Sequence, residues 1–129
     1  MSVSENEDIF TTWTSDVQGT NVSIVYLCGE LDASSTPSFL ADVQEIISRR
    51  RDIIMDVHLL SYVDSTGVAA MLSVRNALRE FGKNLYLAGC HGLLTKILNT
   101  IQVSNDLVCF ENADQAIAAI RSTDKANGL

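Results

Sequence analysis

Two kinds of hydrophobic spacing alternate along the 129-residue chain. Short β-type runs occur at 10–14, 21–28, 53–57, 84–88 and 106–110, and helical spacing occurs at 36–51, 65–82, 93–101 and 112–120. This alternation is typical of α/β folds, in which helices connect mostly parallel strands through right-handed crossovers. Only a short turn around Gly19 separates the first two strands, so this pair is predicted to form an antiparallel hairpin.

Residue types at the ends of these runs support the predicted boundaries. Thr36 and Pro37 suit the N-cap and the first position of a helix, and Gly82 suits a helix end. The fold class is therefore predicted as α/β, with a mixed, mostly parallel sheet of four to five strands flanked by about four helices. A single domain is expected at 10–121, between a flexible N-terminus at 1–9 and a flexible tail at 122–129.

The most informative motif is the segment 64–67, of sequence DSTG, which lies between a buried strand and a helix. A helix start carries free backbone N–H groups and a partial positive charge, so it suits oxygens and anions. Ser65 has two interpretations here: a helix cap, or a hydroxyl offered to another enzyme as a phosphate acceptor. Asp64 and Thr66 are competing candidates for the cap, and the sequence does not decide between them.

The helix after Ser65 carries apolar residues on more than one side. At about 100° per residue, the core face is predicted to hold six apolar residues: Ala70, Met71, Val74, Ala77, Leu78 and Phe81. Val68, Leu72 and Arg75 fall on the far side with Ser65. Three explanations stay open for the apolar pair: scattered surface residues, cover by another helix, or a docking patch for a partner.

Gly67 is unexpected in a first helical turn, because glycine there costs about 1 kcal/mol relative to alanine. The close approach of a partner's backbone would explain it. Tight packing on Gly29 or on the sheet would explain it equally well.

Composition and charge narrow the function classes. A formal net charge of −7 opposes nucleic-acid and anionic-membrane binding. No apolar run is long enough for a membrane span, and the acidic start lacks the features of a signal peptide, so a cytoplasmic protein is expected. Cys28, Cys90 and Cys109 are far apart and odd in number, which favours reduced, packed thiols over a disulfide or a metal site.

Motifs for catalysis are missing from the sequence. It contains no phosphate-binding loop, no dinucleotide fingerprint and no nucleophile elbow. His58 and His91 lack metal-ligand spacing. Asp56 and Asp64 could form a carboxylate pair, although each has a plain role at a strand end or a helix cap. We therefore expect no catalytic residues, no metal and no cofactor.

The chain resembles the STAS domain family, the fold of bacterial anti-sigma factor antagonists. Three features carry the resemblance: residues 29–32 (GELD) after the second strand, the run 54–67 ending in DSTG, and the subsequent order of helix, strand, helix, strand, helix. The resemblance covers roughly residues 10–121. It implies a non-catalytic regulator that binds an anti-sigma factor serine kinase when unphosphorylated and so releases a sigma factor.

The resemblance also implies roles for individual residues. Ser65 corresponds to the serine whose phosphorylation by the kinase ends binding and which a phosphatase restores. Asp32 resembles the loop aspartate near that serine, and Val68 stands where the family has a leucine that contacts the kinase. The expected partner-binding set is Asp32, Asp64, Thr66, Gly67, Val68, Leu72 and Arg75. The alternative is a scaffold subunit, in a stressosome-like assembly or a lipid-transport complex, in which Ser65 is only a cap; the oligomeric state stays open.

Overall fold

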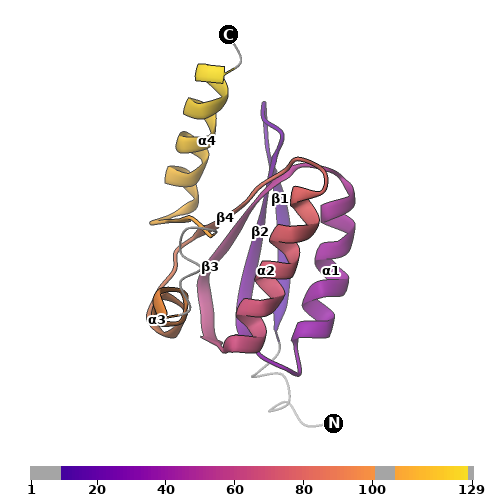
Figure 1. Cartoon of the computed structure of the whole chain (residues 1–129), viewed down its shortest axis with the longest axis vertical. Helices are drawn as coiled ribbons and strands as arrows, with labels where there is room; N and C mark the ends of the chain where they lie inside the picture. Colours follow the sequence, from indigo (N-terminus) through magenta and orange to yellow (C-terminus); the bar gives the residue numbers. More distant parts are fainter. Residues whose placement is uncertain (1–9, 101–106, 128–129) are drawn as a thin grey trace.

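The computed structural model describes residues 10–100 and 107–127 (Figure 1). The elements follow the predicted order of alternating strands and helices. They are β1 (Thr11–Val17), β2 (Val22–Leu31), α1 (Thr36–Ser48), β3 (Asp52–Val63), α2 (Ser65–Arg79), β4 (Leu85–Ala88), α3 (Gly92–Thr100), β5 (Cys109–Phe110) and α4 (Ala113–Asn127).

The sheet has five strands in the order β1-β2-β3-β4-β5. β1 pairs with β2 in antiparallel fashion, and each of the other neighbouring pairs is parallel. The hairpin turn contains Gly19 at φ 75°, a left-handed conformation that glycine adopts without steric cost. The predicted α/β class, the mixed sheet and the antiparallel first pair are therefore confirmed.

Each face of this sheet contributes to a hydrophobic core. α1 and α2 lie side by side across one face (Figure 1), where Phe39, Met55 and Met71 belong to the main core. Successive strand residues point to opposite faces, so Ile54 faces the other way and packs with Ala116 and Ile120 of α4. β3 thus contributes to both cores, as expected for an inner strand.

Two strands are longer than the sequence predicted. β2 continues through 29–31, and β3 reaches Val63 instead of ending at Val57. The extra residues pair with each other across two register shifts, one between Tyr26 and Cys28 and one between Gly29 and Glu30. A bulge interrupts the regular alternation of faces, which is why periodicity did not reveal these extensions.

The last two elements also differ from expectation. β5 has two residues rather than five, and α4 is helical as far as Asn127, whereas a flexible tail was expected from 122. Asn112 caps α4, with its Oδ1 accepting a hydrogen bond from the Gln115 backbone N at 2.9 Å. The expected flexible N-terminus 1–9, the predicted positions Ile101 and Asp106, and residues 128–129 lie outside the described residues.

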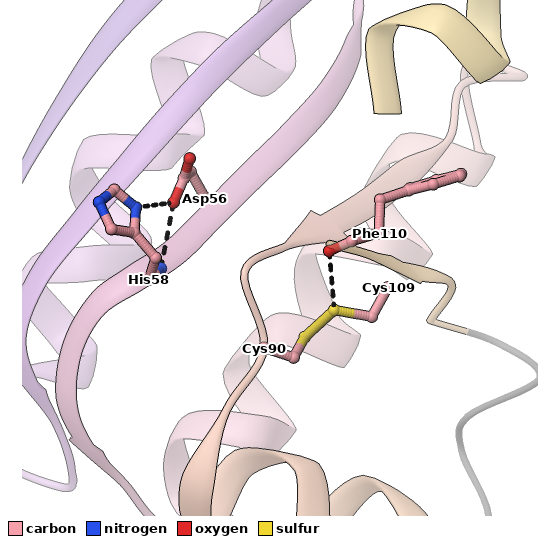
Figure 2. The surroundings of a disulfide bond; sticks show 5 residues. All are labelled: Asp56, His58, Cys90, Cys109 and Phe110. Carbon is pink, nitrogen blue, oxygen red and sulfur yellow. Dashed lines mark hydrogen bonds and ion pairs between the residues drawn. A yellow bond between two sulfur atoms is a disulfide. The ribbon is translucent and has the colours of Figure 1, made fainter. Parts of the chain in front are cut away.

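The cysteine prediction was wrong for two of the three residues. Cys90 and Cys109 form a disulfide with a Cα–Cα distance of 6.4 Å (Figure 2), and Cys28 is free. Cys90 lies just beyond β4 and Cys109 lies in β5, and these strands are paired neighbours. Spatial proximity of residues 19 positions apart depends on strand order, which cysteine spacing does not encode.

Candidate functional site

Strand pairing brings the segments that follow β2 and β3 together at one end of the sheet. Leu31, the last residue of β2, pairs with Val63, the last residue of β3. Asp32 and Asp64 follow directly, and the Asp64 backbone N donates to the Leu31 carbonyl oxygen at 3.4 Å. The loop that starts at Asp32 therefore lies beside the first turn of α2, which contains Ser65.

Asp64 is the residue that caps α2. Its backbone is extended, and its Oδ1 accepts a hydrogen bond from the Gly67 backbone N at 3.1 Å. This contact satisfies one of the free N–H groups at the helix start. Ser65 and Thr66 are consequently not the cap, and both residues are exposed.

Gly67 owes its identity to packing inside the domain. A Cβ atom at this position would lie 2.7 Å from the Leu31 carbonyl oxygen and 2.7 Å from Val63 Cγ2. No side chain fits there unless α2 moves away from the sheet. Of the two explanations left open by the sequence, close packing on the sheet therefore accounts for the glycine.

The placement of Val68 on the outer side of α2 was wrong. Val68 is 0% exposed and belongs to the main core, and Gly67 is also buried. The reason is that α2 packs against both α1 and the sheet, so its buried sector is wider than one stripe. Neither residue presents a surface to a partner in this structure.

Leu72 and Arg75 lie on a half-exposed part of α2. Leu72 is partly buried against the main core, and Arg75 Nη2 donates to Asn76 Oδ1 at 3.0 Å. Phe81, which was expected to face the core, follows the helix end and is 39% exposed. The Arg50 guanidinium lies 4.6 Å from the centroid of the Phe81 ring.

Asp32 organises the loop beside Ser65. Its Oδ1 accepts hydrogen bonds from Ser34 Oγ at 2.8 Å, Ser34 N at 3.0 Å and Ser35 N at 3.1 Å. These donors, first of all the Ser34 hydroxyl, hold the pKa of the Asp32 carboxyl below its usual value. Asp32 is therefore ionised at neutral pH and places a negative charge in the loop beside Ser65.

Three further exposed residues border this site and were missed by the sequence analysis. Ala69 and Ser73 lie one and two turns after Ser65 on α2, and Ser34 lies in the Asp32 loop. The available signal for the first two was their spacing of four and eight residues from Ser65, which places them on the same side of the helix. For Ser34, no signal pointed to the site before the Asp32 hydrogen bonds were known.

Asp56 and Asp64 do not form a carboxylate pair. Asp56 is buried and bonds to the imidazole Nδ1 and the backbone N of His58 (Figure 2). Asp56 and His58 line a cavity of about 400 Å³ together with Gly89 and residues 111–114.

Within the described ranges, no group of three His, Cys, Asp or Glu side chains is arranged to hold a metal ion. Among the described helices, none has the length and apolar character needed to cross a membrane.

Solved structures with this fold include bacterial regulators and part of a transporter. An anti-sigma factor antagonist from Mycobacterium paratuberculosis is similar with a TM-score of 0.79 and 17% identity, covering 88% of this chain and 96% of that chain. The anti-sigma factor antagonist SpoIIAA in its unphosphorylated form gives a TM-score of 0.65 and 21% identity, covering 86% and 98%. The murine Solute Carrier 26 family member A9 anion transporter gives 0.73 and 17%, covering 93% of this chain and 24% of that one.

At these identities the likeness establishes the fold. Curated proteins gave no match. A model of the STAS domain matches residues 15–116, in agreement with the resemblance seen in the sequence. The chain therefore belongs to the STAS domain family.

Proposed function

We propose that this chain is an anti-sigma factor antagonist that acts as a phosphorylation switch at Ser65. In its unphosphorylated form it binds an anti-sigma factor serine kinase in the cytoplasm, and the sigma factor held by that kinase is released. Phosphorylation of Ser65 by the kinase ends the binding, and a serine phosphatase restores it. The chain itself is a non-catalytic regulator in this scheme.

The proposal depends on the different structural roles of Asp64 and Ser65. Asp64 already provides the capping oxygen of α2, so the fold does not need the Ser65 hydroxyl for that role. Ser65 is exposed at the helix start, where the dipole favours an added anion by roughly 0.3–1 kcal/mol. A phosphate on Ser65 is thus compatible with the folded domain.

The charges around Ser65 explain why phosphorylation would affect a complex more than the fold. A phosphate adds about −1.5 to −2 charges at pH 7. On Ser65 this charge would lie next to Asp64 and beside the loop that contains the Asp32 carboxylate. Like charges 4 Å apart repel by about 1 kcal/mol in water and by about 4 kcal/mol at an effective dielectric of 20. Water screens this repulsion in the free protein, whereas a docked partner removes the water.

The burial of Gly67 and Val68 limits the proposed contact surface to exposed and half-exposed residues. It consists of Ser65, Thr66, Leu72 and Arg75 with Asp32 and Asp64, extended by Ala69 and Ser73. Gly67 and Val68 support this surface from below, because they fix how α2 lies on the sheet.

Phosphorylation and binding assays with the candidate kinases of the native host test this proposal. We expect ATP-dependent phosphate incorporation that site-resolved mass spectrometry assigns to Ser65. Ser65→Ala should bind the kinase as the unmodified chain does, and Ser65→Asp should bind at least about tenfold more weakly, which corresponds to about 1.4 kcal/mol. Both variants should keep the melting temperature of the parent chain, and Ser48→Ala, an exposed serine at the end of α1 outside the proposed contact surface, is the matched control.

Equal binding by Ser65→Ala and Ser65→Asp would refute the switch. Absence of phosphate on Ser65 in the native host would favour the scaffold alternative, since this fold also occurs within a transporter. Sedimentation of the purified chain would then show whether it forms a large assembly.

A further inference from the structure

We propose that the disulfide between Cys90 and Cys109 is a reversible thiol–disulfide exchange site that controls how firmly α3 is held against β3. The reductant is a dithiol, either a small molecule or a protein with two neighbouring thiols. Oxidised, the bond ties the start of α3 to the edge strand β5. Reduced, it lets this corner of the domain open more often.

The attachment of β5 to the sheet is short, so the disulfide is a large part of it. β5 pairs with β4 at two positions, Leu87 with Cys109 and Ala88 with Phe110. Two backbone hydrogen bonds of 2.9 Å connect these segments, from Leu87 N to Val108 O and from Gly89 N to Phe110 O. The covalent bond adds a further connection, directly between the segment that leads into α3 and β5 (Figure 2).

The two cysteine residues differ in exposure in the way that exchange requires. Cys109 is exposed, whereas Cys90 is partly buried and packs against the main core. We therefore place the attack of a solvent thiolate on Cys109 Sγ, which displaces Cys90 as the leaving thiolate. Exchange of this kind needs no change of fold to begin.

The chemical balance of the reduction is simple. The first thiolate of the dithiol forms a bond to Cys109 Sγ while the Cys90–Cys109 bond breaks, and Cys90 takes up a proton. The second thiolate of the dithiol attacks its own partner sulfur, which releases Cys109 as a thiol. Two electrons and two protons pass to the protein, and the dithiol leaves as a disulfide.

The start of α3 connects the disulfide to β3 just before Ser65. Cys90 is followed by His91, whose Nε2 lies 3.2 Å from the His58 carbonyl oxygen of β3. His91, Gly92 and Leu94 line a small cavity of about 60 Å³ with Val57 and residues 60–63 of β3. The packing there is incomplete, and Cys90 directly precedes the residues of the α3 segment that line the cavity.

Reduction is expected to loosen α3 and not to unfold it. Leu94 and Leu98 of α3 are buried in the main core, so the helix keeps hydrophobic anchors without the bond. A disulfide acts mainly by restricting open states of the chain. The expected effect is thus a higher frequency of local opening at α3 and β5.

The consequence for partner binding rests on the proposed function. A cytoplasmic partner-switching protein would meet a reducing environment, in which disulfides are mostly transient or redox-sensing. Loosening α3, which packs against β3 just before Ser65, would then link the redox state to the docking surface.

Hydrogen exchange measured by mass spectrometry tests the inference directly. The wild-type chain is compared before and after treatment with dithiothreitol, and again after reoxidation with oxidised glutathione. We expect the oxidised chain to be 2 Da lighter than the reduced one, because reduction adds two hydrogens. Hydrogen exchange in α3 and β5 should be about tenfold or more slower in the oxidised chain than in the reduced chain. Exchange in α1 and β1 should stay the same.

Cysteine variants provide matched controls. Cys28→Ser removes the free thiol and should respond to dithiothreitol as the wild type does. The double variant Cys90→Ser/Cys109→Ser should show the fast exchange of the reduced chain with or without dithiothreitol. If the double variant fails to fold, the wild-type comparison still decides the question.

Two results would overturn the inference: free thiols at Cys90 and Cys109 in the glutathione-oxidised chain, or equal exchange of α3 in both redox states. The Ser65 assays are scored separately on the same samples. A redox effect on exchange without Ser65 phosphorylation refutes the proposed function alone. A working Ser65 switch with identical exchange in both states refutes the redox inference alone.

Discussion

Single residues at the start of α2 separate the structural role of the motif from its proposed chemical role. Asp64 caps the helix, and Gly67 permits its close approach to Leu31 and Val63. Ser65 and Thr66 lie between these two positions and remain exposed. The segment 64–67 thus contains two residues that shape the connection between β3 and α2 and two that are exposed to solvent.

Replacing Gly67 by alanine tests this account with a reversal of sign. Helix propensity alone predicts that Gly67→Ala stabilises α2 by about 1 kcal/mol. The 2.7 Å approaches to Leu31 O and Val63 Cγ2 predict a loss of about 1–3 kcal/mol in the free energy of unfolding instead. Urea denaturation measures the difference.

The matched control for this prediction is Ser73→Ala, an exposed position on the same helix. It should change the free energy of unfolding by no more than about 0.5 kcal/mol. A gain in stability for Gly67→Ala would mean that α2 does not lie as close to the sheet as described.

At the scale of elements, α2 presents different sides to the protein and to solvent. Val68 is buried in the main core, whereas Leu72 is only partly buried against it. Both are apolar, and both were expected on the outer side. α2 contacts α1 and α3 as well as strands of the sheet, and a helical wheel of α2 alone does not include this cover by neighbouring elements.

Alanine substitutions at Val68 and Leu72 should therefore have opposite effects: the first should mainly lower stability, and the second should mainly weaken kinase binding. Val68→Ala should lower the free energy of unfolding by roughly 1–3 kcal/mol, because it leaves a cavity in the core. Its effect on kinase binding should be small once the folded fraction is taken into account. Leu72→Ala should cost less stability and weaken kinase binding more.

Urea denaturation and binding titrations on the same preparations measure both quantities. Larger binding loss for Val68→Ala than for Leu72→Ala would show that the exposed side of α2 is not the docking surface.

For the whole molecule, the sheet joins the two hydrophobic cores into one unit. β3 contributes Ile53 and Met55 to the main core and Ile54 to the core under α4. β1 lies at the opposite edge from β5, and its Trp13 stacks on Tyr26 of β2 with ring centroids 5.2 Å apart. Opening of one core therefore disturbs the other through a shared strand.

This arrangement predicts a single cooperative unfolding transition of the oxidised chain. Trp13 is the only tryptophan in the sequence, so its fluorescence reports on the β1 edge, while far-UV circular dichroism reports on all helices and strands. The two signals should give coincident midpoints in urea. An earlier fluorescence midpoint would show that the β1–β2 hairpin separates from the domain first.

Much of the site could be predicted because its features are local in sequence. The DSTG segment, the strand before it and the helix after it identify an exposed hydroxyl at a helix start without knowledge of the fold. The choice of Asp64 as the cap could not be predicted, because Asp64, Ser65 and Thr66 are all suitable residue types. Backbone geometry decides among them, since Asp64 alone is extended in the N-cap position with its carboxylate on the Gly67 N–H.

The sequence by itself determined the order of strands and helices, the antiparallel start, the mostly parallel sheet and the Ser65 corner, because each depends on periodicity or on residue types within a few positions. Only the tertiary structure decided the burial of Val68, the tight fit of Gly67, the length of β3 and the pairing of Cys90 with Cys109. These features depend on which segments become neighbours in space. Contacts between residues far apart in the chain leave no regular trace in local spacing.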